Sequence, residues 1–247
     1  MARALRIVLL TVLLAACLAG QEKPDEIGFF QEDQAGPSVE KFILALDGGS
    51  WTMNCYVAWD AESRHAVVID PGTPSQKIKA FIQSEQLIVQ AILLTHGHGD
   101  HVGGVVDLAA VFPAAPIYLH RDDQKAAARV TGSATVFRDY PDNGQLSTGK
   151  MQFQVIPTPG HSPGSVCLRS GDILFSGDTL FAGTIGKACG DNPAQREANF
   201  RREVKNIQDR LLTHPTQTRV FPGHGPSTTI GREKSFNRFL TNGEASS

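Results

Sequence analysis

The chain has 247 residues, of which 41% are hydrophobic, and this is enough to fill the core of one sizeable globular domain. Its 23 basic and 25 acidic side chains nearly balance, and no run of lysine or arginine offers a surface for nucleic acid. We therefore expect a globular protein with no nucleic-acid partner.

The N-terminus has the pattern of a secretory signal. Arg3 and Arg6 precede an apolar run over residues 7–16, which is much shorter than the roughly 20 residues of a membrane-spanning helix. The run ends in Leu-Ala-Ala before Cys17 and resembles the bacterial lipobox, in which the signal is cut before a lipid-bearing cysteine. Ordinary cleavage after Ala19 is the alternative. We predict export, a lipid on Cys17, and membrane anchoring in a bacterial cell envelope, on the periplasmic or extracellular face.

The segment after the predicted signal (residues 1–16) has no periodic pattern. Residues 17–38 are polar and acidic with interspersed proline and glycine, which predicts a flexible tether. The folded domain is expected over residues 39–247.

Short strand-like runs alternate with helical patterns in this domain. A capping box with an early proline, Thr73-Pro74-Ser75-Gln76, predicts a helix over about 75–86. Apolar residues with helical spacing predict further helices after residue 104 and over 196–212. Interleaved strands and helices favour an α/β domain in which helices cover a sheet. The predicted strands are 41–46, 54–59, 66–69, 90–94, 116–119, 151–156, 165–168 and 173–175.

Residues 95–104 read THGHGDHVGG, which places three histidines and an aspartate within six residues. Three further turns each present one similar side chain after a strand-like run. Loops at strand ends are where scaffolds present functional groups, so these turns can converge on one edge of a sheet. The candidate ligands are His96, His98, Asp100, His101, His161, Asp178 and His224.

Imidazole nitrogen and carboxylate oxygen are ligands that zinc accepts, and they also suit iron or manganese. Seven donors exceed the three or four that one catalytic zinc uses, so we predict two divalent ions that share Asp178. Gly97 and Gly99 are expected to let the backbone turn tightly enough for neighbouring donors to face different ions.

Other residues of the same types have simpler interpretations. A single histidine near a strand end is usually structural, and this is our expectation for His65, His120 and His214. Asp178 taken alone could cap a turn, and Asp70 alone could form the turn that Asp-Pro-Gly favours. Cys167 is predicted to be a core residue, whereas the sequence leaves the roles of Cys55 and Cys189 open.

The spaced histidines and aspartates resemble those of the metallo-β-lactamase fold superfamily over about residues 42–240. The resemblance implies an αββα sandwich in which His96, His98 and His161 hold one ion. It assigns the other ion to Asp100, His101 and His224, with Asp178 bridging the two. Asp70 then resembles the aspartate that steadies the ligand loop.

Several segments are similar to the glyoxalase II-like group of short bacterial hydrolases. They are residues 54–56, 68–72, 177–181 and 223–231. β-Lactamases of this fold have cysteine or serine where Asp178 stands, which argues against antibiotic hydrolysis. The chain departs from glyoxalase II because it ends without the C-terminal helical extension and has Ala188-Cys189 where a tyrosine is expected. Lys187 matches the basic residue of that group and is predicted to meet a substrate carboxylate, and a solvated loop lysine is the alternative.

The resemblance implies a binuclear hydrolase that cleaves a small-molecule thioester, ester or lactone with a metal-bridging hydroxide. Asp100 is expected to orient the hydroxide and accept its proton as the catalytic side chain. One alternative is a persulfide dioxygenase-like enzyme with a single iron held by His96, His161 and Asp178. A non-catalytic metal-binding lipoprotein is another. The substrate and the oligomeric state stay open.

Overall fold

The computed structural model describes residues 36–46, 49 and 51–241. The predicted signal, the predicted lipidation site Cys17 and most of the predicted tether lie outside the described residues. The first strand, β1, begins at Ser38, the last residue of that predicted tether. Within the described ranges, no helix is both long enough and apolar enough to cross a membrane.

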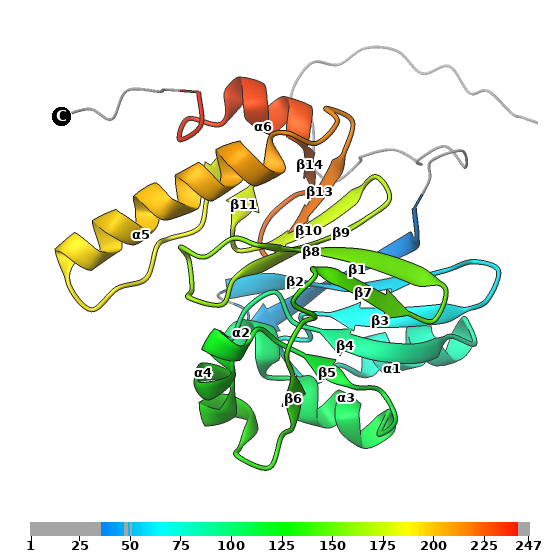
Figure 1. The fold of residues 1–247 in the computed structure, drawn as a ribbon. Helices are drawn as coiled ribbons and strands as arrows, with labels where there is room; N and C mark the ends of the chain where they lie inside the picture. Colours follow the sequence, from blue (N-terminus) through cyan, green and yellow to red (C-terminus); the bar gives the residue numbers. More distant parts are fainter. Residues whose placement is uncertain (1–35, 47–48, 50, 242–247) are drawn as a thin grey trace, which may run out of the picture. The chain divides into compact units, whose positions relative to one another are not determined.

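Two mixed sheets form the centre of the domain, and both are visible edge-on in Figure 1. The first sheet follows the chain order and contains β1 (Ser38–Leu46), β2 (Trp51–Trp59), β3 (His65–Ile69), β4 (Ile88–Leu93), β5 (Ile117–Tyr118) and β6 (Phe137–Arg138). The second has the order β14 (Thr228–Thr229), β13 (Arg219–Pro222), β10 (Ile173–Gly177), β9 (Val166–Ser170), β8 (Met151–Pro157) and β7 (Gln145–Thr148). A small separate ribbon pairs β11 (Leu180–Phe181) with β12 (Thr184–Ile185).

Side chains of the first sheet alternate between two cores. Val57, Val68, Ile92 and Ile117 are paired across neighbouring strands and pack into the core that the helices share. Their chain neighbours, such as Val67, point to the opposite face and pack against the second sheet. Because successive side chains of a strand point to opposite faces, both faces of this sheet are buried.

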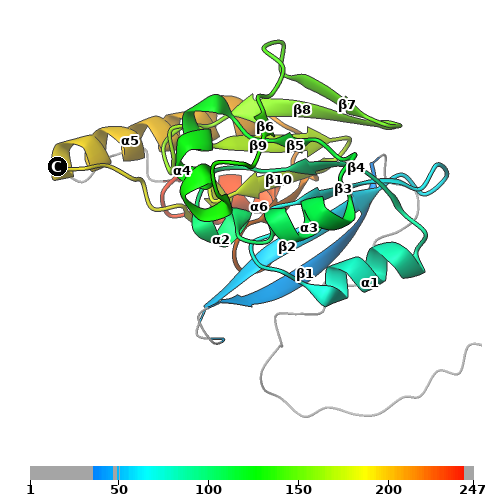
Figure 2. The ribbon, with the colours of Figure 1, turned by 90° about the horizontal axis from the view of Figure 1, so that it is seen from below.

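Helices cover the outer face of each sheet, as Figures 1 and 2 show. The first sheet is covered by α1 (Gln76–Ser84), α3 (Val105–Val111) and α4 (Arg121–Thr131), whose apolar side chains join its outer core. The second is covered by α5 (Pro193–Asn206), a π-helical turn (Ile207–Leu211) and α6 (Ile230–Phe236). The result is the expected αββα sandwich.

Several local expectations need correction. The N-cap of α1 is Ser75, whose hydroxyl accepts from the Ile78 amide, so Pro74 lies before the helix rather than at its first position. The helix predicted over 196–212 begins earlier, at Pro193, and its N-cap residue is Asn192. Its last turn is π-helical. Helix α4 was not predicted, because its buried apolar side is made of alanine and gives no stripe of large residues.

Candidate metal centre

The candidate ligands lie at the carboxyl ends of strands. His96 and His98 follow β4, His161 follows β8, Asp178 follows β10 and His224 follows β13. Strands β8, β10 and β13 run in the same direction, since β8 and β10 are both antiparallel to β9 and β13 is parallel to β10. Their ends therefore meet at one edge of the second sheet.

Asp100 and His101 lie in a short helix, α2 (Gly99–Val102). His98 is its N-cap residue. The helical turn aims neighbouring side chains in different directions, so the two residues can face different partners. A four-residue helix is too short to produce a periodic pattern in the sequence.

The structure brings His96, His98 and His161 together. The Nε2 atom of His161 lies 3.2 Å from Nε2 of His96 and 2.8 Å from Nδ1 of His98. All three rings are buried or half-buried. This is a three-nitrogen group of the kind that holds one divalent ion.

A second group consists of Asp100, His101 and His224. An Oδ2 atom of Asp100 lies 3.3 Å from Nε2 of His224 and 3.8 Å from Nε2 of His101. Asp178 lies between the two groups. Its Oδ1 is 3.2 Å from Nε2 of His101, and its Oδ2 is 3.5 Å from Nε2 of both His161 and His224. The position fits a carboxylate shared by two ions.

Three inward atoms of this cluster have no hydrogen-bond partner among the described residues. Nε2 of His101, Nε2 of His224 and Oδ1 of Asp178 are buried without a hydrogen bond to any described residue. Buried polar atoms are normally paired, and such a convergence of unpaired nitrogen and oxygen atoms suits cations. The residues present therefore fit two divalent ions.

The outward ring atoms are held by hydrogen bonds. Nδ1 of His161 donates to the Lys187 carbonyl at 3.0 Å, and Nδ1 of His224 donates to the Thr52 carbonyl at 2.7 Å. Nδ1 of His96 contacts the Thr95 hydroxyl at 3.1 Å. With the proton on the outer nitrogen, the inner nitrogen keeps its lone pair for a ligand bond.

Asp70 organises the other side of the ligand segment. Its Oδ2 lies 2.9 Å from Nδ1 of His101 and accepts from the Thr95 hydroxyl at 2.6 Å, while Oδ1 accepts from the Thr95 amide at 2.8 Å. The Asp70 backbone has a φ of 51°, which is uncommon for aspartate. The Asp70 carboxylate thus bonds to the ligand segment rather than closing a local Asx turn, and its steadying role stays a prediction.

Burial and neighbouring charges separate the pKa values of the cluster. Burial lowers the pKa of His96 well below its ordinary value and also lowers that of His161. Burial acts in the same direction on His101, but Asp178 and Asp70 outweigh it and raise the pKa well above the ordinary value. Burial tends to raise the pKa of Asp100, yet the His224 and His101 rings hold it below its usual range. Asp100 is therefore ionised at neutral pH.

Two residues of the loop after β12 reach this cluster. Lys187 contributes its backbone carbonyl to His161, while its exposed side chain lines a pocket of about 500 Å³ together with Phe200 and Phe239. Sγ of Cys189 lies 3.7 Å from Nε2 of His98. Cys55 and Cys167 are fully buried core residues, so the expectation for Cys167 is confirmed.

Some contributors could not be identified from the sequence. The Thr52 carbonyl is a backbone group, and Thr95 has no signal beyond its position beside His96. Among the histidines expected to be structural, His120 caps α4 by accepting from the Asp122 amide.

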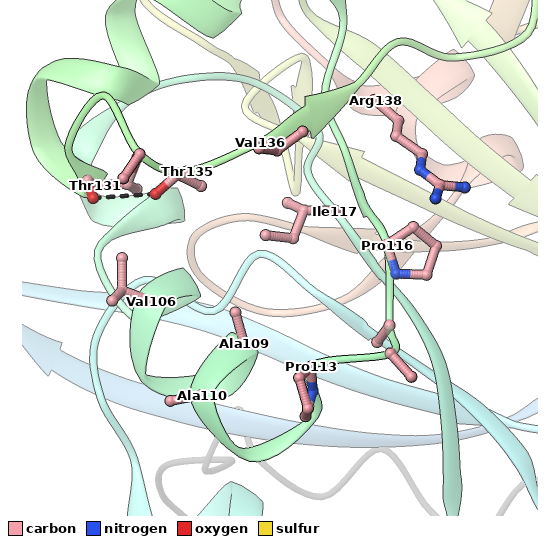
Figure 3. Close-up of a pocket in the computed structure, with 13 residues that line it drawn as sticks. Val106, Ala109, Ala110, Pro113, Pro116, Ile117, Thr131, Thr135, Val136 and Arg138 are labelled. Carbon is pink, nitrogen blue, oxygen red and sulfur yellow. Dashed lines mark hydrogen bonds between the residues drawn. The ribbon is translucent and has the colours of Figure 1, made fainter.

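A pocket of about 540 Å³ lies between α3 and the segment that joins α4 to β6, away from the candidate ligands (Figure 3). Its lining combines apolar side chains, such as Val106 and Ile117, with polar ones, such as Thr135 and Arg138. Because it contains none of the candidate ligands, it is not the site of the chemistry.

Residues 49–224 match the model of the metallo-beta-lactamase superfamily, and the chain belongs to that superfamily. Members of this class are metal-dependent hydrolases whose fold binds divalent ions.

Particular relatives are consistent with this class. A protein of uncharacterised function from Mycobacterium leprae is 33% identical over 221 residues, which cover 80% of this chain and 98% of that protein. A hydroxyacylglutathione hydrolase of Yersinia enterocolitica is 38% identical over 153 residues, which cover 61% of this chain and 56% of that enzyme.

Two solved structures have the same fold. The BLEG-1 B3 metallo-beta-lactamase has 33% identity and a TM-score of 0.69, and the match covers 83% of this chain and all (100%) of that one. TTHA1623 in a di-iron-bound form has 38% identity and a TM-score of 0.62, with coverage of 81% and 100%.

Proposed function

We propose that the protein is a binuclear metal-dependent hydrolase that cleaves thioesters, esters or lactones of small molecules in a glyoxalase II-like reaction. The observation that carries this proposal is the position of Asp178 between two groups of donors, with its inward oxygen and the facing nitrogens unpaired. Each of the two groups offers three donors to one ion, and a carboxylate between them can serve as a further ligand of both ions.

His96, His98 and His161 would hold one ion, and Asp100, His101 and His224 the other, with Asp178 common to both. Zinc is the proposed metal, and iron or manganese would also suit these donors. The di-iron form of TTHA1623 supports iron as the second choice. When bound, two such ions supply Lewis acidity for a carbonyl oxygen and make water a nucleophile near neutral pH.

The chain itself supplies positioning and a proton acceptor. Asp100 is ionised and its side chain is partly exposed, so it can orient an attacking water and take its proton. The hydrogen bonds to Lys187 and Thr52 fix the rings of His161 and His224, so the donors need little rearrangement during turnover.

The surroundings of Lys187 support a substrate class. Its side chain and the Phe200 and Phe239 rings line one pocket, which would suit an apolar group that carries a carboxylate. The similarity to a hydroxyacylglutathione hydrolase supports thioesters as the preferred bonds.

A hydrolysis screen of zinc-, iron- and manganese-loaded protein tests the proposal. We expect thiol release from acyl thioesters, and we expect His101→Ala to abolish it while the circular dichroism spectrum stays native. Unchanged turnover in His101→Ala would contradict the proposal. Retained metal binding without hydrolysis of any substrate would favour the non-catalytic alternative, and oxygen consumption by the iron-loaded sample would favour the dioxygenase.

β-Lactams are the second substrate class to be tested, because BLEG-1, a B3 metallo-beta-lactamase by its name, is similar over most of this chain. They belong in the same screen. Faster turnover of β-lactams than of any thioester would replace the first proposal with this one.

We also propose that the protein is exported and anchored to a membrane through a lipid on Cys17. The support is the lipobox-like sequence at the end of the apolar run. Fractionation of cells that express the full chain tests this, with wild type expected in the membrane fraction and Cys17→Ser in the soluble fraction. A Cys17→Ser protein that stays with the membranes would contradict the anchor.

A further inference from the structure

Asp123 is a buried carboxylate in the first turn of α4, and it is not one of the candidate ligands. The residue is 2% exposed, whereas its neighbour Asp122 is exposed. Acidic side chains in the first turn of a helix ordinarily complement the helix dipole and face solvent. The side chain of Asp123 is instead turned into the protein, so the helix start does not account for it.

The Asp123 carboxylate accepts hydrogen bonds from two separate ligand-bearing segments. Oδ2 accepts from the Gly97 amide at 2.9 Å, and Gly97 lies between His96 and His98. The same oxygen accepts from the Ser162 hydroxyl at 2.6 Å, and Oδ1 accepts from the Gly164 amide at 2.9 Å. All three donors are buried with it, so these bonds form away from water and are of the stronger, charge-assisted kind.

The glycines of these segments allow the close approach. A Cβ at Gly97 would lie 2.6 Å from the Asp123 backbone oxygen and 2.9 Å from its Cβ, and a Cβ at Gly164 would lie 2.8 Å from its Cγ. Neither glycine has a positive φ, so the need is for space and not for an unusual backbone conformation. Both segments therefore pack directly on Asp123.

Asp70 and Asp123 hold different parts of the centre. Asp70 binds Thr95 and His101, which belong to one continuous segment. Asp123 connects that segment with the loop that carries His161, which is distant in sequence. Its hydrogen bonds join the two loops that supply His96, His98 and His161.

We propose that Asp123 is a positioning residue that sets the distance between His161 and the His96–His98 pair and thereby the affinity of the ion that these three residues hold. This inference rests on the proposed metal centre. It predicts that loss of the Asp123 carboxylate weakens the binding of one of the two ions. Binding of the other ion, held by Asp100, His101 and His224, should be unchanged.

Zinc titration of the metal-free full chain against a competing chelator tests this. Replacement of groups that orient metal ligands typically weakens metal binding about 10–100-fold, and we expect Asp123→Ala to weaken one of two zinc ions by that factor. Ser162→Ala, which removes one of the three donors, is expected to have a smaller effect of the same kind. In the double variant the two effects should not add, since both remove the same contact.

Two control variants separate positioning from general stability. Asp122→Ala removes the same charge from the same helical turn, and the Asp122 carboxylate lies next to the His120 ring and not, among the described residues, next to the ligand loops. Glu233→Gln disturbs another buried carboxylate, which binds Gly183, Thr228 and Asn237. We expect Glu233→Gln to lower the melting temperature and both controls to keep zinc affinities within about twofold of wild type.

The inference fails if Asp123→Ala lowers only the melting temperature, as Glu233→Gln does, while both zinc affinities stay unchanged. It also fails if Asp123→Ala weakens the binding of both zinc ions equally. A wild-type protein that binds no zinc gives a different result, because it would overturn the proposed metal centre itself and this inference with it.

Discussion

Each histidine of the centre has one ring nitrogen committed to a partner outside the cluster. His101 is paired with Asp70, His161 with a backbone carbonyl and His224 with another. The protonation state of the inward nitrogen therefore depends on its own surroundings. His96 and His161 are neutral because burial lowers the pKa of each, whereas carboxylates raise the pKa of His101.

This difference predicts that metal binding releases protons. In the metal-free protein His101 is charged at pH 7, and so is part of the His224 population, whose pKa is raised by Asp100 and Asp178 against the effect of burial. Zinc must displace those protons, so we expect release of about one proton or more per chain and an affinity that rises from pH 6 to pH 8. Calorimetry in two buffers of different ionisation enthalpy measures the release.

Asp70→Asn is the matched variant for that prediction. It removes one of the charges that raise the pKa of His101, so it should release fewer protons at the same pH. Zinc binding with no proton release in wild type would show that the assigned charge state of His101 is wrong.

Lys187 gives a second prediction at this scale. Lys187→Ala keeps the backbone carbonyl that binds His161 and removes only the exposed ammonium. We expect KM for a carboxylate-bearing thioester to rise about tenfold, or about 1.4 kcal/mol, with kcat nearly unchanged. A neutral thioester should be unaffected, and Lys150→Ala, at another exposed lysine, is the control. Equal losses with both substrates would make Lys187 a structural residue.

The ligand segment was predictable because its residues are adjacent in the chain, and the structure places all seven candidate ligands together. Asp123 was not predictable. In the sequence it is one of two aspartates at the start of a helix, and only the tertiary fold shows that one carboxylate faces solvent while the other joins two loops. The Thr52 carbonyl could not be found from side-chain patterns at all.

At the scale of elements, α2 is held by close backbone contacts with the segment after β3. A Cβ at Gly72 would lie 1.7 Å from the Asp100 carbonyl oxygen, and a Cβ at Gly103 would lie 2.4 Å from the Gly72 oxygen.

A Cβ at Gly99 would make only an ordinary contact, 3.5 Å from Val130. Neither Gly97 nor Gly99 has a positive φ, so any requirement for glycine at these two positions comes from the missing side chain and not from an unusual backbone conformation. Gly97 provides space beside Asp123, and Gly99 has no steric requirement.

Alanine substitutions test this account of α2. Gly72→Ala should destabilise the protein by about 1–3 kcal/mol or more, because backbone atoms have to move, and it should weaken metal binding through the shift of Asp100. Gly99→Ala should stay within about 1 kcal/mol of wild type. Urea denaturation of the metal-free proteins measures both. Equal destabilisation by the two substitutions would contradict the proposed packing.

The larger elements were predictable from hydrophobic periodicity, and the shorter ones were not. Strands β2 and β3 are largely buried runs, β8 alternates buried and exposed side chains, and the sequence pattern identifies all three. Helix α4 and the two-residue strands at the sheet edges carry too few large apolar residues to stand out. Their positions can be inferred only from the αββα sandwich as a whole. The resemblance to the superfamily predicts that sandwich, and the superfamily match confirms it.

At the scale of the whole molecule, stability should depend on pH through Glu203. This residue of α5 is fully buried, and neither carboxylate oxygen has a hydrogen-bond partner among the described residues. Burial, with a smaller contribution from Asp178, raises its pKa from 4.5 to about 9. The folded protein therefore retains a proton that the unfolded chain releases above pH 4.5.

The sign of the effect follows from that difference. The stabilisation is complete below pH 4.5 and is lost as the pH rises towards 9, by about 1.4 kcal/mol per pH unit at most. We expect Glu203→Gln, which cannot ionise, to lose less stability than wild type between pH 6 and pH 9. Denaturant midpoints at the two pH values measure this. Parallel losses in the two proteins would show that Glu203 does not titrate in this range.

The central claim is that side chains from distant turns form a pocket for two cations that share Asp178. Anomalous diffraction from crystals of the zinc-loaded protein, recorded at the zinc absorption edge, tests it most directly. We expect two peaks about 3.5–4 Å apart, one on each side of the Asp178 carboxylate. A single peak, or peaks remote from Asp178, would contradict the account.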